Sequence, residues 1–160
     1  MTDNQLHYRR LLADRTVTHW CKWATLASFV PVSTLDVLAI AGTQAKMIHS
    51  LCKIYNVPFE KEAVSSILSS FAGGGIAALL GGSVAGSFVG KIPLVGKPLL
   101  VASYPLFAYA ATYAIGAVFI AHFEKRGTVE DLSTEAFRDF YNQRLLHAKS
   151  IFKRTKIKTS

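Results

Sequence analysis

Charged and apolar positions are segregated along this chain. Residues 63–90 carry no charged side chain, and neither do residues 98–123. Each stretch is longer than the roughly 20 apolar residues that a helix needs to cross the hydrocarbon core of a bilayer. The linker between them, residues 91–97, contains the Pro and Gly of a turn. The pattern predicts two transmembrane helices, at about 63–90 and 98–123, joined as a hairpin.

Small residues recur at every fourth position of the first uncharged stretch: Ser66, Ser70, Gly74, Ala78, Gly82, Gly86 and Gly90. This spacing aligns them on one face of a helix, as a glycine zipper. In lipid, such a face lets two helix backbones approach closely. We therefore assign helix packing to Gly74, Ala78, Gly82, Gly86 and Gly90, and to Ala110 and Ala114 of the second helix, whose small face has helical spacing.

The segment before the hairpin is apolar but interrupted. Pro31 breaks it, and Ser33 and Thr34 are capping candidates for a new helix from about Leu35 to Tyr55. We expect residues 20–56 to form a kinked helix that lies on, or dips into, the cytoplasmic leaflet, because a carboxylate is costly at the centre of a bilayer. Asp36 and Gln44 are candidate polar or partner-binding residues. The alternative role for Asp36 is to cap the second half of this helix.

Charge indicates the topology. The 160 residues are 51% hydrophobic and 18% charged, with a net charge of +8 that lies almost wholly outside the hairpin. The excess of Lys and Arg on both flanks predicts that both termini are cytoplasmic. The first residues lack the apolar run of a signal peptide. We expect a bacterial inner-membrane location.

The two ends of the chain differ in character. Residues 1–19 read as a polar segment. Residues 128–160 begin with a capping-box pattern, Thr128 to Asp131, followed by an apolar stripe typical of an amphipathic helix. Basic residues crowd its end, and we assign them to the membrane surface: Lys149, Lys153, Arg154, Lys156 and Lys158. The alternatives are a solvated helix end and, less favoured, nucleic acid, for which the tail has no recognisable binding fold.

Residues 20–127 resemble a known family. The motifs that carry the likeness are residues 31–36 (PVSTLD), 44–48 (QAKMI), 54–57 (IYNV), 111–116 (ATYAIG) and 122–127 (HFEKRG), together with the glycine-rich helix. They are similar to the YcjF-like family of GTPase-associated membrane domains. The resemblance implies a membrane domain that works beside a GTPase. Ser33 and Asn56 depart from the family's usual Pro and Gly, but Asn tolerates the left-handed conformation that Gly would supply.

No catalytic, metal or cofactor site is expected. A P-loop needs two glycines five residues apart, then Lys and Ser or Thr. Residues 85–92 have Ala85 in place of the first Gly and Ile92 in place of the hydroxyl residue. The five histidines have no ligand spacing. Cys21 and Cys52 are not paired in a motif, so we expect them to be reduced packing residues.

The sequence therefore predicts an all-α membrane protein, with a glycine-rich transmembrane hairpin flanked by cytoplasmic or interfacial amphipathic helices. We expect a non-enzymatic anchor or adaptor for a cytoplasmic partner such as a GTPase, without a cofactor and without nucleic acid. The alternative is a self-associating pore-forming or membrane-remodelling protein, in which the small-residue stripe packs against other copies. A soluble helical bundle that inserts conditionally is a third reading.

Overall fold

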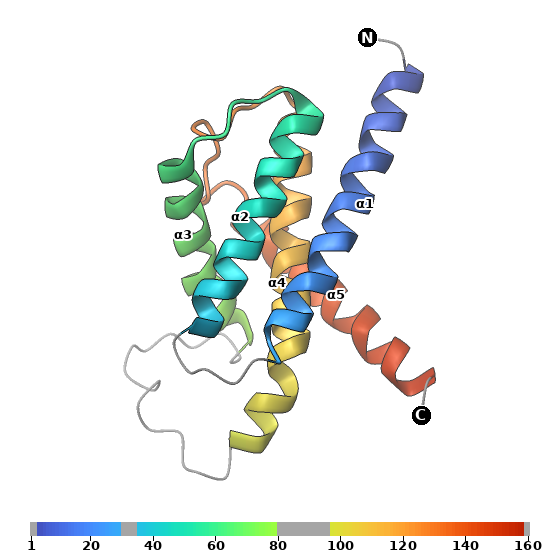
Figure 1. The fold of residues 1–160 in the computed structure, drawn as a ribbon, viewed down its shortest axis with the longest axis vertical. Coiled ribbons are helices and arrows are strands. Elements are labelled where there is room, and N and C mark those ends of the chain that lie inside the picture. The colour runs from blue at the N-terminus through green and yellow to red at the C-terminus, as the bar shows by residue number, and fades with distance from the viewer. Residues whose placement is uncertain (1–2, 30–34, 80–96, 159–160) are drawn as a thin grey trace.

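The computed structural model describes residues 3–29, 35–79 and 97–158 (Figure 1). These residues form five α-helices: α1 Asp3–Ala27, α2 Leu35–Tyr55, α3 Lys61–Leu79, α4 Lys97–Glu124 and α5 Arg138–Lys158. No strand occurs in these ranges. The all-α class predicted from the sequence is confirmed for them.

Helix α4 is the centre of the bundle. It packs against α1, α2 and α5, while α3 packs against α2 and α5 (Figure 1). Apolar residues lie on every side of α4, and a helix of this kind is stable in water only when other helices cover it. Ile115, Val118, Phe119 and Ile120 are accordingly buried.

Helices α1 and α4 run antiparallel in a constant register. Arg10 near the start of α1 bonds to Glu124, the last residue of α4. Two turns further along α1, Val17 lies directly over Gly116. The approach is close because Gly116 has no side chain: a Cβ there would lie 2.5 Å from Cγ2 of Val17. Gly116 therefore sets how near α1 comes to α4.

Helix α2 lies beside α4 in the parallel sense. Its Gln44 side chain donates a hydrogen bond from Nε2 to Oγ1 of Thr112, at 3.3 Å, inside the core. Tyr55 at the end of α2 reaches Glu124 at the end of α4. Helix α2 also ends where the sequence predicted, at Tyr55. Both contacts hold the same register along the two helices.

Helix α3 faces the core with a different set of residues from its small-residue stripe. Val64, Ile67, Leu68 and Phe71 are buried, and the Phe71 ring stacks on Tyr141 of α5 with ring centroids 4.7 Å apart. The first two members of the stripe, Ser66 and Ser70, are exposed. Within the part of α3 that can be described, the stripe therefore points away from the bundle.

The small face of the second helix, with Ala110 and Ala114, could meet the glycine stripe of the first uncharged stretch. Gly82, Gly86 and Gly90 of that stripe lie outside the described residues, so this pairing stays a prediction. In the described ranges α3 and α4 share no substantial interface with each other, and both pack against α2 and α5. Helix α1 runs without a break from the segment interpreted as polar, residues 1–19, into the segment expected to begin the kinked helix at residue 20.

Helices α2 and α4 end in the same way. Asn56 and Arg126 follow the last helical turns with φ angles of 58° and 65°. Beyond them, the N–H groups of Val57 and Gly127 bond to the carbonyls of Cys52 and His122, five residues back. This is the Schellman motif, in which glycine is the usual left-handed residue. Asn56 thus adopts the left-handed conformation that asparagine was expected to tolerate.

The capping box forms, but it does not start a helix. The Thr128 hydroxyl donates to Oδ2 of Asp131 at 2.8 Å, and the N–H of Asp131 donates to the same hydroxyl. Val129 and Leu132 are buried, so the chain next to them follows the core in a series of turns. Helix α5 begins only at Arg138. The helix expected directly after residue 128 therefore starts about ten residues later.

The tight contact at Gly116 gives a test of the α1–α4 packing. Gly116→Ala should lower the free energy of unfolding by about 1–3 kcal/mol, because the new methyl group overpacks against Val17. The measurement is the melting temperature of the protein purified in detergent. Gly42→Ala is the matched control, since nothing lies within 4 Å of a Cβ there. The control should stabilise by up to about 1 kcal/mol. Adding Val17→Ala should recover part of the loss; equal melting of the two glycine variants would contradict the packing.

Candidate functional site

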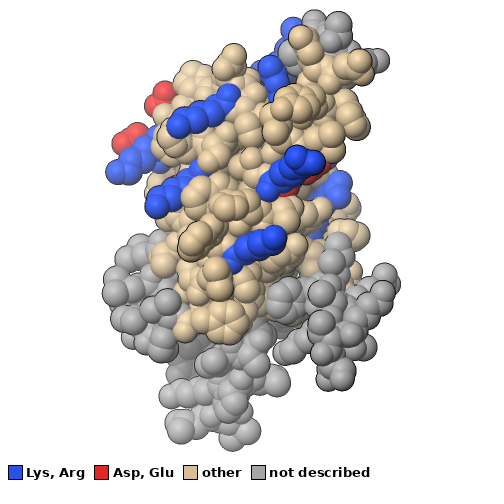
Figure 2. Space-filling view, turned by 45° about the vertical axis from the view of Figure 1, so that its right-hand side comes forward, with Lys and Arg blue, Asp and Glu red and all other residues tan. Residues whose placement is uncertain are grey.

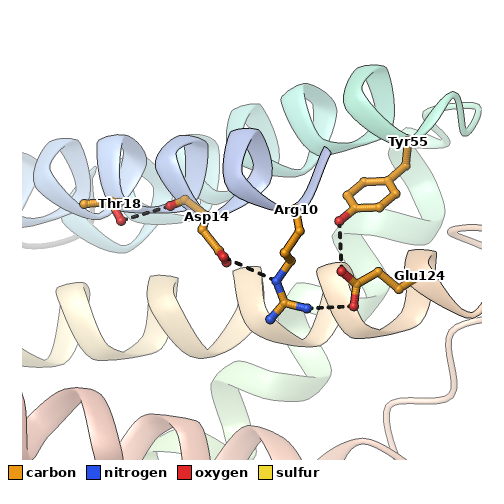
Figure 3. Close-up of polar contacts among 5 residues, drawn as sticks. All are labelled: Arg10, Asp14, Thr18, Tyr55 and Glu124. Carbon is orange, nitrogen blue, oxygen red and sulfur yellow. Dashed lines mark hydrogen bonds and ion pairs between the residues drawn. The ribbon is translucent and has the colours of Figure 1, made fainter. Parts of the chain in front are cut away.

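Polar side chains tie three helices together at one end of the bundle (Figure 3). Nη1 of Arg10 donates to Oε2 of Glu124 at 2.7 Å, and Nε of the same guanidinium lies 3.3 Å from Oδ2 of Asp14. The Tyr55 hydroxyl donates to the other oxygen of Glu124, at 3.5 Å. We call Arg10, Asp14, Tyr55 and Glu124 the polar clasp. It joins the first half of α1 to the last residues of α2 and α4.

The charges of the clasp act on one another. Burial raises the pKa of Tyr55 to about 12, and the negative charge of Glu124 adds to the effect. The guanidinium of Arg9 lies 5.8 Å from the centroid of the Tyr55 ring, in a cation–π contact. Desolvation lowers the pKa of Arg10, but the hydrogen bond and charge of Glu124 outweigh it, so this pKa is raised. Both side chains keep their ordinary protonation states at neutral pH.

The clasp is a partly exposed ion-pair network of modest strength. The Arg10 and Glu124 side chains are 46% and 34% exposed, so solvent screens the pair and its contribution stays below about 1 kcal/mol. No group of three or more potential metal ligands occurs in the described ranges. An open depression over the first turns of α3 is lined by Lys61, Glu62 and three serines.

Gln44 and Asp36, the polar candidates from the sequence, occupy different environments. Gln44 is buried, and its amide is engaged with Thr112 rather than offered at the surface. A buried amide bonded across two helices fixes their register, because shifting either helix would leave polar atoms unpaired. Asp36 lies in the first turn of α2, where its side chain is outside the described part of the structure.

His122 closes the end of α4 next to the clasp. Its Nε2 lies 2.8 Å from the carbonyl oxygen of Thr128 and therefore carries the proton that it donates. The ring occupies the space in which a Cβ of residue 127 would lie, so only glycine fits there. The edge of Phe137 packs against the same ring. His122 is thus a packing residue at the start of the connection from α4 to α5.

The remaining predicted site residues lie in separate places. Ala110 and Ala114 are fully buried in the core around α4. Gly74 and Ala78 belong to α3, and Gly82, Gly86 and Gly90 fall outside the described residues. The basic residues assigned to the membrane surface all belong to the second half of α5, and their side chains are not described: Lys149, Lys153, Arg154, Lys156 and Lys158. Cys21 and Cys52 are free thiols and buried, as predicted.

The fold gathers the uncharged segments at the end opposite the clasp. We call this the apolar end: residues 23–29 of the chain, the first half of α2, the last turns of α3 and the first half of α4. In these segments, Asp36 and Lys97 are the only charged residues. Lys and Arg side chains are spread over the rest of the bundle, over a face that is otherwise mostly uncharged (Figure 2).

One helical segment in the described ranges is long and apolar enough to cross a membrane. It is Pro105–Glu124 of α4, with a mean hydropathy of 1.6 and with 61% of its apolar 18-residue stretch buried inside the bundle. The central helix of a helical bundle in water meets the same criterion. Hydropathy alone therefore does not separate a span from a core helix here.

The clasp and the first part of α1, residues 3–19, were not predicted from the sequence. Arg10 and Glu124 lie 114 residues apart, and no local pattern pairs two surface charges over that distance. A signal for α1 was nevertheless present. Its buried side is a row of small residues at helical spacing: Ala13, Val17, Cys21 and Ala24. Such a row indicates close packing against a partner helix.

Comparison with known proteins places this helical bundle in a family. The pattern of DUF697, a domain of unknown function, matches residues 2–150. A relative, magnetosome membrane protein 22 of Magnetospirillum gryphiswaldense, is 36% identical over 148 residues, which cover 92% of this chain and 76% of the relative. No solved structure matches.

The chain therefore belongs to the DUF697 family. The match covers α1 as well as the segments that carried the resemblance seen in the sequence. The clasp, which uses residues from α1, α2 and α4, lies wholly inside the matched region.

The clasp can be tested by a double-mutant cycle. Arg10→Gln and Glu124→Gln should each lower the free energy of unfolding by less than about 1 kcal/mol, and the double variant should lose less than the sum, because both remove the same bond. The measurement is thermal unfolding at low and high salt, since salt screens the pair. Lys53→Gln, an exposed charge near the same end, is the control. Strict additivity of the two losses would show that the bond is not formed.

Proposed function

We propose that this protein is a non-enzymatic membrane anchor whose apolar end enters the bilayer and whose clasp end stays in the cytoplasm. One observation carries the proposal: the fold collects its uncharged segments, which lie far apart in the sequence, at one end of a single bundle. In water, such an exposed apolar end would favour aggregation. In a bilayer it is the part that inserts.

Three further observations support membrane attachment. A relative is a magnetosome membrane protein by name. The chain carries a net charge of +8, which favours an anionic membrane surface. Helix α5 leaves the bundle sideways, with its C-terminus towards the apolar end (Figure 1), and its second half is the most basic part of the chain.

The alignment of α1 with α4 limits how far the proposed transmembrane hairpin, residues 63–90 and 98–123, would enter the bilayer. The second half of α4 lies level with Arg10, Arg15 and Lys22 of α1. Charged side chains within hydrocarbon cost a few kcal/mol each. We therefore place the first half of α4 in the bilayer and its second half in the cytoplasmic part of the bundle.

The clasp end is the surface proposed for a cytoplasmic partner. Its charges are partly exposed and of both signs, as in the polar rim of a protein interface. The resemblance to the YcjF-like family supports a GTPase as that partner. In this arrangement the protein acts as an adaptor that holds the GTPase at the inner membrane of a bacterium.

Self-association is a second candidate function, and one observation favours it. Ser66 and Ser70 begin the small-residue stripe of α3 and face away from the rest of the chain. A small-residue face that is not covered within one chain is available to a second copy. This would lead to the alternative raised by the sequence, a pore-forming or membrane-remodelling oligomer.

Membrane insertion is the first expectation to test. The protein expressed in bacteria should remain in the membrane pellet after carbonate and high-salt washing, because its attachment is apolar. Reporter fusions at both ends should read cytoplasmic. Release into the supernatant by either wash would contradict insertion, and a periplasmic signal from either end would contradict the topology.

Cysteine crosslinking separates the adaptor from the oligomer. In protein without its native cysteines, Ser70→Cys should give few crosslinked dimers in membranes if the protein is a monomeric adaptor. Leu146→Cys, exposed on α5, measures random collision. Ser70→Cys dimers well above those of the control, together with dye release from liposomes by the purified protein, would favour the self-associating function instead.

A further inference from the structure

Helix α1 exposes large apolar side chains and buries small ones, which is the reverse of the usual pattern for a helix in water. The exposed large apolar residues of the described ranges are Leu6, Tyr8, Leu11, Trp23, Leu26, Phe29 and Leu146. All but Leu146 belong to α1 or to the turn directly after it. The residues that α1 turns into the bundle are small instead. Its outer face is therefore suited to an apolar covering.

The exposed residues fall into two groups along α1. Tyr8 and Leu11 lie near the clasp, among Arg9, Arg10 and Asp14. Trp23, Leu26 and Phe29 lie at the apolar end and are 52%, 58% and 67% exposed. No charged residue follows Lys22 in the described part of this segment, which ends at residue 29. The second group continues the apolar end of the bundle onto its outer surface.

We propose that Lys22, Trp23, Leu26 and Phe29 form an interfacial anchor, which lies at the boundary between lipid headgroups and acyl chains and marks how deeply the bundle enters. The proposal rests on the membrane attachment argued above and deepens it, because it assigns the position of the bilayer surface. Leu26 and Phe29 lie on the acyl side of the boundary, and Lys22 on the headgroup side.

The chemistry of these residues fits a lipid boundary. Tryptophan concentrates at membrane interfaces, where one edge is apolar and its N–H meets polar groups. The N–H of Trp23 donates to Nε2 of His19, one turn towards the clasp, at 3.0 Å. Trp23 therefore has its polar partner on the headgroup side. Lys22 can bury its aliphatic stem and extend its ammonium group to anionic headgroups.

A second copy of the chain fits this face less well. Arg15 and Lys22 are exposed on α1, and residues 15–29, which include the proposed anchor, contain no acidic side chain. Two such faces packed together would bring like charges into contact in either orientation, at a cost in free energy. A membrane containing anionic lipid instead supplies the complementary charge.

The alignment of α1 with α2 and α4 indicates where these two helices would cross the proposed bilayer surface. Ala24, Ile40 and Ala108 pack together as one small cluster. This layer lies one residue beyond Trp23 and therefore just inside the proposed boundary. Gln44 and Thr112, bonded one turn nearer the clasp, lie just outside it. The polar bond of the core thus sits on the aqueous side of the layer.

Tryptophan fluorescence tests the anchor. With Trp20→Phe, Trp23 is the single tryptophan of the chain. The purified protein is reconstituted into vesicles of phosphatidylcholine and phosphatidylglycerol whose acyl chains carry bromine near the headgroup or near the chain end. Trp23 should show blue-shifted emission and stronger quenching by the shallow bromine than by the deep one.

Two matched variants place the same probe elsewhere. In protein lacking both native tryptophans, Leu11→Trp reports on the clasp end of α1, and Leu146→Trp reports on an equally exposed apolar position of α5. Both should be quenched by an aqueous quencher and not by brominated lipid. Adding Leu26→Gln and Phe29→Gln to the Trp23 protein should shift its emission to the red.

Each outcome decides between the proposals. If the protein fails to float with the vesicles, membrane attachment itself is contradicted. If it floats but Trp23 ignores brominated lipid, the anchor alone is overturned. Equal lipid quenching at residues 11 and 23 would place the whole of α1 in the bilayer and overturn the assigned depth. A Trp23 shielded from both quenchers would indicate a protein covering instead of lipid.

Discussion

The contact between Val17 and Gly116 is the constraint on which the arrangement of α1 depends. Without a side chain on Gly116, the two isopropyl methyl groups of Val17 lie almost against the backbone of α4. This closeness fixes the antiparallel register of α1. The register in turn brings Arg10 within 2.7 Å of Glu124 at one end. At the other end it brings Ala24 into the same layer as Ala108.

The same register gives the bundle two chemically different ends. Charges at the start of α1 meet the ends of α2 and α4, while uncharged turns from four helices meet at the opposite end. Helix α4 runs through both regions. Its apolar composition serves core packing in its second half, where α1, α2 and α5 cover it. Helix α4 is therefore apolar for two reasons: core packing in its second half and, in the proposed arrangement, contact with lipid in its first half.

Local patterns predicted much of the secondary structure. Helix α2 runs from Leu35 to Tyr55 as expected from the Pro31 break and the capping candidates after it, and α4, Lys97–Glu124, coincides with the second uncharged stretch. Asn56 takes up the left-handed conformation that its side chain tolerates. Each of these features depends on residues close in the sequence.

Tertiary choices were harder to predict. The amphipathic pattern of α1 is inverted, with small residues inside and large apolar ones outside, so residues 3–19 were interpreted as part of a polar segment. In α3, Val64, Ile67 and Phe71 face the core, which the spacing of the small residues did not indicate. Thr128 and Asp131 form their capping bonds in a turn, because Val129 and Leu132 are drawn into the core.

The long separation between Arg10 and Glu124 has a consequence for biosynthesis. Helix α1 leaves the ribosome well before α4, because Glu124 is added 114 residues after its partner Arg10. Until then α1 has only α2 to pack against. Non-local pairing of this kind slows folding, and a nascent chain with exposed apolar side chains is prone to wrong contacts. A membrane surface or a chaperone that receives α1 during translation would protect the chain until α4 emerges.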